Sequence, residues 1–219
     1  MHGSICLASL TLMLTACLGH GGGPSLFDGK TTTGWRAYKG TACPAGWQVI
    51  EGALTRVAEA GDIVTVEEYQ DFLFEFEWKV APGGNSGVMF HVTEDHDYPW
   101  ETGPEYQILD NEAHKDGLDP RTSAGSNYAM HAPASDVTRP AGEWNEARIL
   151  VRGPHVEHWL NGEKVVEYEL WSADWEGRVA QCKWKDRPDY GRRASGRIAL
   201  QDHGDQVAFR NLRIQRLAR

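Results

Sequence analysis

The chain has 219 residues, a length that suits one substantial domain with its own hydrophobic core. Its formal net charge is −9, from 31 acidic and 22 basic residues, and it contains no Lys/Arg-rich run. Because such a chain repels phosphate, we expect no nucleic-acid partner. The nine Trp residues are many for this length, and surplus Trp is typical of a sandwich core or of stacking on sugar rings.

Residues 1–24 are predicted to be a leader and a flexible tether rather than part of the fold. The apolar run Ile5–Ala16 is far shorter than the roughly 20 residues that span a bilayer. It ends in Leu14-Thr15-Ala16-Cys17, which resembles a bacterial lipoprotein signal, although Met1–Ser4 lacks the usual Lys or Arg. The resemblance implies acylation of Cys17 and export to the periplasmic or cell-surface side of a membrane, with plain secretion as the alternative. We expect no other membrane contact and predict no protein partner.

Two cysteines, Cys43 and Cys182, follow the leader. In an oxidising compartment they either pair or remain two separate thiols, and the sequence leaves both alternatives open. No CxxC pair or HExxH motif is present, so we expect no structural zinc site.

From Ser25 onward the sequence is mostly a series of short strands. Alternation is strict in Phe72–Val80, where the aromatic residues share one face and Glu75, Glu77 and Lys79 share the other. We therefore predict a strand with one core face and one wet face, and we expect 86–92 to be its antiparallel neighbour. The other predicted strands are 47–50, 53–56, 62–66, 105–110, 145–151, 156–160, 164–168, 196–201 and 207–215.

Turn and cap residues divide these strands. Glu51-Gly52 and Asn161-Gly162 are two-residue hairpin signals. Residues 172–185 form the only predicted helix, with Ser172 as a candidate N-cap. The segment 111–144 is long and irregular, which is typical of a functional loop or lid. Together these features predict a single all-β sandwich over residues 25–219, with one short helix and one long irregular loop.

Several segments, taken in order, resemble the 3-keto-disaccharide hydrolase family. The resemblance extends over about residues 25–217 and implies a concanavalin A-like jelly roll that cleaves glycosides oxidised at C3. The matching segments are 26–30 (LFDGK), 34–35 (GW), 85–90 (NSGVMF), 103–110 (GPEYQILD), 142–145 (GEWN), 159–162 (WLNG), 198–204 (IALQDHG) and 209–212 (FRNL).

A C3 ketone acidifies the C2 hydrogen, so a base can remove that proton, the enolate can expel the C1 alkoxide, and water can add back. This route needs a general base, a group that stabilises the enolate oxygen, and an acid for the leaving group. A divalent metal is one candidate for the second role. Two alternatives stay open: a non-catalytic carbohydrate-binding module, and a glycosidase acting on unoxidised glucans.

Glu105 and His203 are the predicted catalytic residues. Glu105 lies on a predicted strand inside a matching segment, with Gln107 on the same face as a candidate substrate contact. His203 lies where a strand meets Gly204, and its ordinary pKa suits acid/base work near neutrality. Glu105, Asp110 and His114 are candidate metal ligands, and Asp110 also fits a strand terminator.

Other candidates for substrate contact are spread along the chain. Glu75 and Glu77, two residues apart, are separated by roughly 6.5–7 Å along a strand, which suits an inverting glycosidase pair or a wet sheet face. Aromatic and imidazole candidates are His91, Trp100, Trp184 and His131, whereas Trp35, Trp47 and Trp78 are predicted to be core and Glu112 and Asp116 to be solvated loop residues.

Overall fold

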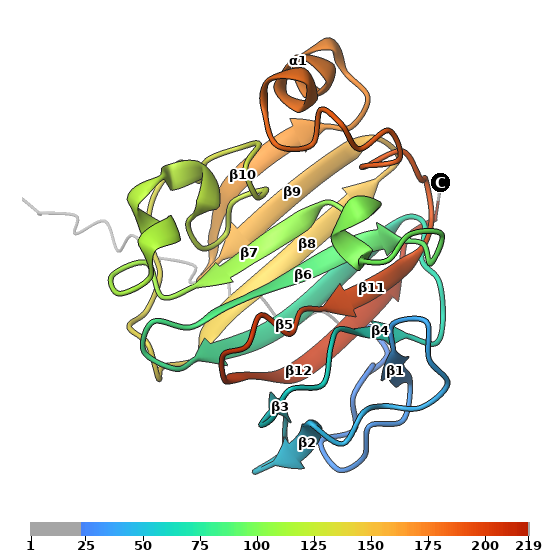
Figure 1. Cartoon of the computed structure of the whole chain (residues 1–219), viewed down its shortest axis with the longest axis vertical. Coiled ribbons are helices and arrows are strands. Elements are labelled where there is room, and N and C mark those ends of the chain that lie inside the picture. The colour runs from blue at the N-terminus through green and yellow to red at the C-terminus, as the bar shows by residue number, and fades with distance from the viewer. Residues whose placement is uncertain (1–22, 219) are drawn as a thin grey trace, which may run out of the picture.

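The computed structural model describes residues 23–218 as two antiparallel sheets packed face to face, with one helix at an end of the sandwich (Figure 1). The five-stranded sheet has the order β1 (Trp35–Ala37), β4 (Ile63–Thr65), β11 (Arg197–Leu200), β6 (Asn85–Val92) and β7 (Glu105–Leu109). The seven-stranded sheet has the order β10 (Glu163–Glu169), β9 (His155–Leu160), β8 (Asn145–Arg152), β5 (Phe72–Val80), β12 (Val207–Arg216), β3 (Ala53–Arg56) and β2 (Trp47–Ile50). The predicted all-β sandwich is confirmed.

The core lies between the two sheets and is built largely from the alternating strands. In β5, Phe72, Phe74, Phe76 and Trp78 are buried, while the residues between them are half-buried on the outer face. Tyr106 of β7 meets Phe76 edge to face at 5.6 Å between ring centroids, which joins the two layers. Trp35 and Trp47 are also buried, so all three Trp residues predicted to be core are confirmed as core.

The predicted pairing of β5 with β6 is wrong. The two strands belong to different sheets: β5 pairs with β8 and β12, and β6 pairs with β11 and β7. The turn between them crosses from one layer to the other. Every residue of β6 is buried, so this strand has no wet face to match that of β5.

The helix and both predicted hairpins are confirmed. Helix α1 (Ala173–Gln181) starts after Ser172, whose side chain accepts the Trp175 N–H. In the described part of the chain, the other helical elements are the short 3-10 turns η1 (Pro99–Glu101), η2 (Lys115–Leu118) and η3 (Pro120–Thr122). Within residues 23–218 no helix is long and apolar enough to cross a membrane. The lipoprotein signal and Cys17 lie outside the described residues.

Cys43 and Cys182 are both free thiols in the structure, which selects the alternative of two separate cysteines. Cys182 instead packs beside Met130, at 3.5 Å between the sulfur atoms.

The long irregular segment 111–144 covers the free edge of β7. Backbone hydrogen bonds run between Gln107 and both Gly125 and Ser126, and from the Tyr128 N–H to the Glu105 carbonyl. These bonds satisfy backbone groups that an edge strand would otherwise expose. Strand β7 is therefore buried on both faces, because the loop closes over the side that would otherwise face water.

Asp110 fixes the start of this segment. Its carboxylate accepts hydrogen bonds from three backbone N–H groups, those of Gly83 at 2.7 Å, Glu112 at 3.2 Å and Ala113 at 3.4 Å. The role of strand terminator fits this geometry, and it ties the β5–β6 turn to the beginning of the loop.

We predict that Asp110→Ala lowers the free energy of unfolding by about 1–3 kcal/mol, because three partly buried hydrogen bonds to backbone N–H groups lose their common acceptor. Thermal or urea unfolding measures the change. Glu112→Gln, at a neighbouring exposed position, is the matched control and should leave stability unchanged. Equal stability of the two variants would contradict the assigned role of Asp110.

Candidate active site

The outer face of the five-stranded sheet carries a row of polar side chains at its centre. Cross-strand pairing sets Gln107 beside Gly87, and the Gln201 N–H bonds to the Gly87 carbonyl at 2.9 Å. Asp62 lies at the start of the next strand, where its carboxylate accepts the Asp202 N–H. The Oε1 atom of Gln201 is buried without a hydrogen-bond partner, so this row offers an acceptor to a polar ligand.

Glu105 occupies the neighbouring row. It is paired with Met89, which belongs to a small apolar cluster with Val64, Val92 and Ala199 on the same outer face. Gly87 makes room for the carboxylate, because a Cβ at that position would overlap Glu105 Oε1. Glu105 is only 4% exposed, so its side chain lies across β6 rather than in solvent.

Burial raises the pKa of Glu105 to about 8, and the nearby carboxylates of Asp62 and Asp116 add to the rise. The ammonium group of Lys183 acts in the opposite direction. The Gln107 amide lies 3.1 Å from Glu105 Oε1. It donates an N–H to the carboxylate, or accepts the proton of the neutral carboxyl after a half-turn of the amide. Glu105 can therefore be held in both protonation states.

Lys183, just beyond the end of α1, was missed by sequence reasoning. Its Nζ lies 4.3 Å from the Tyr128 ring centroid and 4.4 Å from that of Trp184. Desolvation lowers the pKa of Lys183, while the carboxylates of Glu105 and Asp116 oppose that shift. Only the folding of the segment after α1 over the sheet reveals this cation, because one Lys at the end of a predicted helix carries no signal in sequence.

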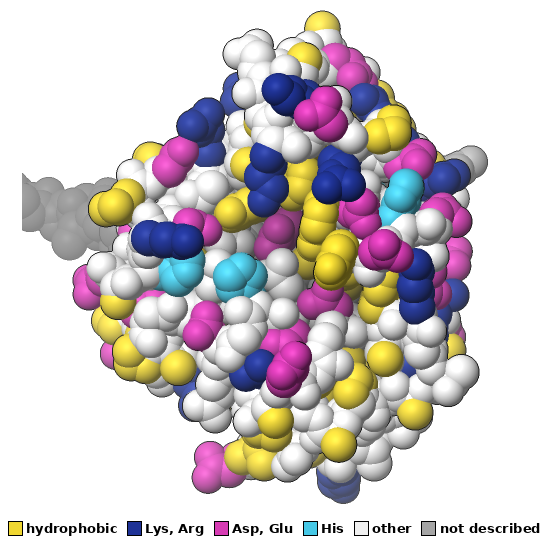
Figure 2. Space-filling view, in the orientation of Figure 1, with side chains coloured by type: hydrophobic (Ala, Val, Ile, Leu, Met, Phe, Trp, Pro, Cys, Tyr) yellow, Lys and Arg dark blue, Asp and Glu magenta, His cyan; other side chains and the backbone are white. Residues whose placement is uncertain are grey.

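His203 and His114 meet edge to face on this side of the sandwich, at 6.4 Å between ring centroids. His114 Nδ1 accepts the Asp116 N–H, and the Asp116 carboxylate accepts the Tyr128 hydroxyl at 3.2 Å. Asp116 is thus part of the site surroundings, and its prediction as a solvated loop residue is wrong. Figure 2, which views this face, shows a hollow with histidine and basic side chains along its rim and acidic side chains within it.

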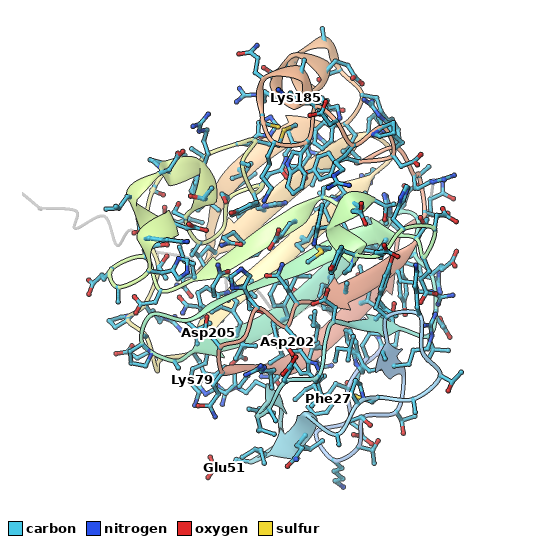
Figure 3. All side chains as sticks on the ribbon, in the orientation of Figure 1. Phe27, Glu51, Lys79, Lys185, Asp202 and Asp205 are labelled. Carbon is cyan, nitrogen blue, oxygen red and sulfur yellow. The ribbon has the colours of Figure 1, made fainter. Side chains whose placement is uncertain are left out.

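The connection between β11 and β12 carries His203 and is held by carboxylates on both sides of it. Asp202 accepts the Arg56 Nε–H at 2.7 Å, and Asp205 accepts the Asn85 N–H at 3.1 Å (Figure 3). His203 itself is exposed. The structure therefore places Glu105 and His203 on the same side of the sandwich, one buried and one at the solvent-facing rim.

Trp100 forms an aromatic platform beside this site. It packs on the outer-face apolar cluster, stacks with Tyr98 at 5.3 Å, and lies under the Arg187 guanidinium at 5.0 Å. Tyr98 is 55% exposed, so the stack continues to the surface. Trp184 is only 1% exposed and stacks on Tyr190, which makes it a support for the platform rather than a sugar-stacking surface.

Two predicted histidines lie outside the site. His91 is 2% exposed, packs edge to face on Phe72, and lies 2.8 Å from the Gln70 carbonyl. Its backbone φ of 53° belongs to a bulge where β6 meets β11, which turns the ring away from the outer face. His131 stacks on Tyr168 at 4.7 Å, and it holds the long loop against β10.

Glu75 and Glu77 lie on the outer face of the other sheet, across the sandwich from Glu105. Glu75 is 3.4 Å from Arg148, and Glu77 accepts the Arg210 Nε–H at 2.7 Å. Because each carboxylate is engaged by an arginine, neither is arranged to give a proton to a leaving group. The structure does not bring these two residues to the predicted catalytic pair.

The candidate metal set of Glu105, Asp110 and His114 is not brought together either. Both oxygens of Asp110 accept backbone N–H groups, and His114 has only Nε2 free of the Asp116 bond. Among residues 23–218, the one group of three His or acidic side chains with ligand atoms within 4.8 Å of one another is His155, Glu157 and Glu167, on the other sheet. Lys164 already contacts both glutamates of that group.

Comparison with known proteins finds relatives over most of the chain. A protein of Bacteroides thetaiotaomicron named 3-keto-disaccharide hydrolase is 34% identical over 87% of this chain and 77% of its own length. A crystal structure from Parabacteroides distasonis, described as a candidate glycosyl hydrolase, is 41% identical, covers 88% of this chain and 93% of that chain, and superposes with a TM-score of 0.82.

More distant similarity shows the fold alone. The carbohydrate-binding module CBM66 of Bacillus subtilis is 14% identical over 84% of this chain and 96% of its own, with a TM-score of 0.53. A protein named as a carbohydrate-binding module therefore has the same kind of sandwich, and the fold by itself does not decide the function. The family profile is decisive, because it matches residues 22–215: the chain belongs to the 3-keto-alpha-glucoside-1,2-lyase-like domain family of glycoside-acting hydrolases.

Proposed function

We propose that this protein hydrolyses the glycosidic bond of 3-keto-disaccharides and related 3-keto-glycosides. The observation that carries the proposal is the buried Glu105 carboxyl, whose pKa is raised to about 8 beside a lysine. A carboxylate with so high a pKa is a stronger base than an exposed one, and the reaction starts with the removal of a proton from carbon. A purely sugar-binding module has no use for a buried, poorly solvated base.

The proposed reaction is an elimination followed by hydration. Glu105 removes the C2 proton, and the C2–H electrons form an enolate with the C3 oxygen. The enolate then re-forms the ketone, makes a C1–C2 double bond, and expels the C1 alkoxide, which takes a proton. Water adds to C1 while C2 regains a proton, so that the sum of the two steps is hydrolysis and Glu105 is restored.

The other residues take roles that follow from their positions. Lys183 stabilises the negative charge that develops on the C3 oxygen, since its ammonium group already acts on the Glu105 carboxylate. His203, at the exposed rim beside His114, exchanges a proton with the leaving oxygen or the incoming water. The platform of Trp100 and Tyr98 stacks on the sugar that leaves. Because residues 1–17 resemble a lipoprotein signal, we propose that the enzyme is exported from the cytoplasm and held at a membrane by a lipid anchor.

Glu105→Gln should lower turnover of a 3-keto-disaccharide by about 100- to 10,000-fold, because the amide cannot accept the C2 proton. Initial rates on 3-keto-trehalose, compared with unoxidised trehalose, measure the effect. Glu112→Gln is the control, since it removes the same charge from an exposed position. Wild-type rates in Glu105→Gln would contradict the assignment of Glu105 as the base.

Gly87→Ala should also lower activity while leaving the fold intact, because the new methyl group displaces the Glu105 carboxylate and not the backbone. Gly177→Ala is the matched control: it lies in α1, and no atom lies within 4 Å of its added Cβ. Circular dichroism tests whether the variant is folded, and kcat tests whether displacement of the Glu105 carboxylate impairs turnover. Unchanged kcat in Gly87→Ala would show that turnover does not require the Glu105 carboxylate to lie against Gly87.

The pH dependence of kcat/KM should show an acidic limb near pH 8, with activity rising as Glu105 loses its proton. Lys183 lowers the pKa of Glu105, so Lys183→Met should move this limb to higher pH. The limb should vanish in Glu105→Gln. An acidic limb that stays in place in both variants would assign it to another group.

A further inference from the structure

A second hollow lies on the outer face of the seven-stranded sheet, on the opposite side of the sandwich from Glu105. Its volume is about 310 Å³, and its lining includes Glu75, Glu77, Glu146, Arg148, Trp159 and Arg213. This volume is at the lower end of the roughly 300–1,000 Å³ that small-molecule sites occupy. The proposed hydrolysis uses none of these residues.

The lining is organised by strand register. Cross-strand pairing places Arg213, Glu75, Arg148 and Trp159 in one row across β12, β5, β8 and β9. An acid therefore stands between two arginines, an indole follows on β9, and Lys164 pairs with that indole residue on β10. Glu77, two residues further along β5, also lines the hollow, and its carboxylate accepts a hydrogen bond from Arg210. Because these groups stand on central strands, their positions are set by the sheet rather than by loops.

Trp159 is fixed in this row. Its Nε1–H donates to the Glu157 carboxylate at 2.7 Å, and the Arg148 guanidinium lies 5.4 Å from the ring centroid. The side chain is half-buried, so part of the ring is open to solvent. A tethered, partly open indole beside paired acids and bases offers an apolar surface next to donors and acceptors.

The balance of charge points to a neutral ligand. The lining holds three glutamates and two arginines, and Arg210 adds a third cation bound to Glu77. A sugar hydroxyl can donate to a carboxylate and accept from the adjacent guanidinium at once, which matches the Glu75–Arg148 pair. The C–H face of a pyranose packs on an indole.

We propose that this hollow is a non-catalytic binding site for unoxidised pyranosides, which holds glycan at the enzyme while the reaction proceeds on the other face. Maltose is a suitable probe, because it lacks the C3 ketone and its binding is separable from turnover. The proposal is independent of the chemistry assigned to Glu105.

The test is a calorimetric titration of the whole protein with maltose. We expect millimolar binding in the wild type, at least tenfold weaker binding in Trp159→Ala, and unchanged kcat on 3-keto-trehalose in that variant. Arg213→Ala, an exposed substitution that spares the core, should weaken binding in the same direction. Trp171→Ala removes a Trp that is 39% exposed and lies outside this hollow, and this variant should bind maltose as the wild type does.

Two results would overturn the proposal. One is the absence of maltose binding by the wild-type protein. The other is binding that survives both Trp159→Ala and Arg213→Ala but is lost in Trp100→Ala, which would place the bound sugar at the Glu105 face. Loss of 3-keto-trehalose turnover in Glu105→Gln concerns only the proposed reaction, so the two proposals can fail separately.

Discussion

Exclusion of water from both faces of β7 is the constraint on which the site depends. On the inner face, Tyr106 and Ile108 are fully buried in the core between the sheets. On the outer face, Glu105 is covered because the segment 111–144 pairs along the strand edge and the residues after α1 fold over the sheet. A carboxyl in this position is stabilised in its neutral form, and its raised pKa follows directly from that burial.

Glutamates on the two outer faces of the sandwich differ in their burial and in their charged partners. At the five-stranded sheet, burial desolvates the Glu105 carboxyl, and only Lys183 opposes the rise of its pKa. At the seven-stranded sheet, Glu75 and Glu77 keep arginine partners and remain partly accessible. Desolvation without a tight partner favours proton transfer, whereas paired and hydrated charges favour recognition of neutral hydroxyl groups. One fold can thereby carry a reactive face and a binding face.

Local sequence patterns predicted most of the strands, turns and the helix. The predictions that were wrong share one cause. The alternation of β5, the hairpin turns at Glu51-Gly52 and Asn161-Gly162, and the cap at Ser172 depend on near neighbours, so they could be found from the sequence. The partner of β6 depends on which layer the chain enters after the turn at Gly83, and no local pattern encodes that choice. For the same reason Glu75 and Glu77, despite their suggestive spacing, fall on the face opposite Glu105.

The sequence by itself determined the sandwich and the family, and it led to the prediction of Glu105 and His203 as catalytic residues, because strand periodicity and the order of motifs can be read along the chain. Tertiary structure alone decided that Glu105 is buried over Gly87, that Lys183 and Asp116 act on it, and that His91 and His131 are packing residues. The physical reason is that desolvation and charge interactions depend on which distant segments cover a side chain. Those segments, 111–144 and the residues after α1, show little periodicity of their own, so their contribution to the site appears only once the chain is folded.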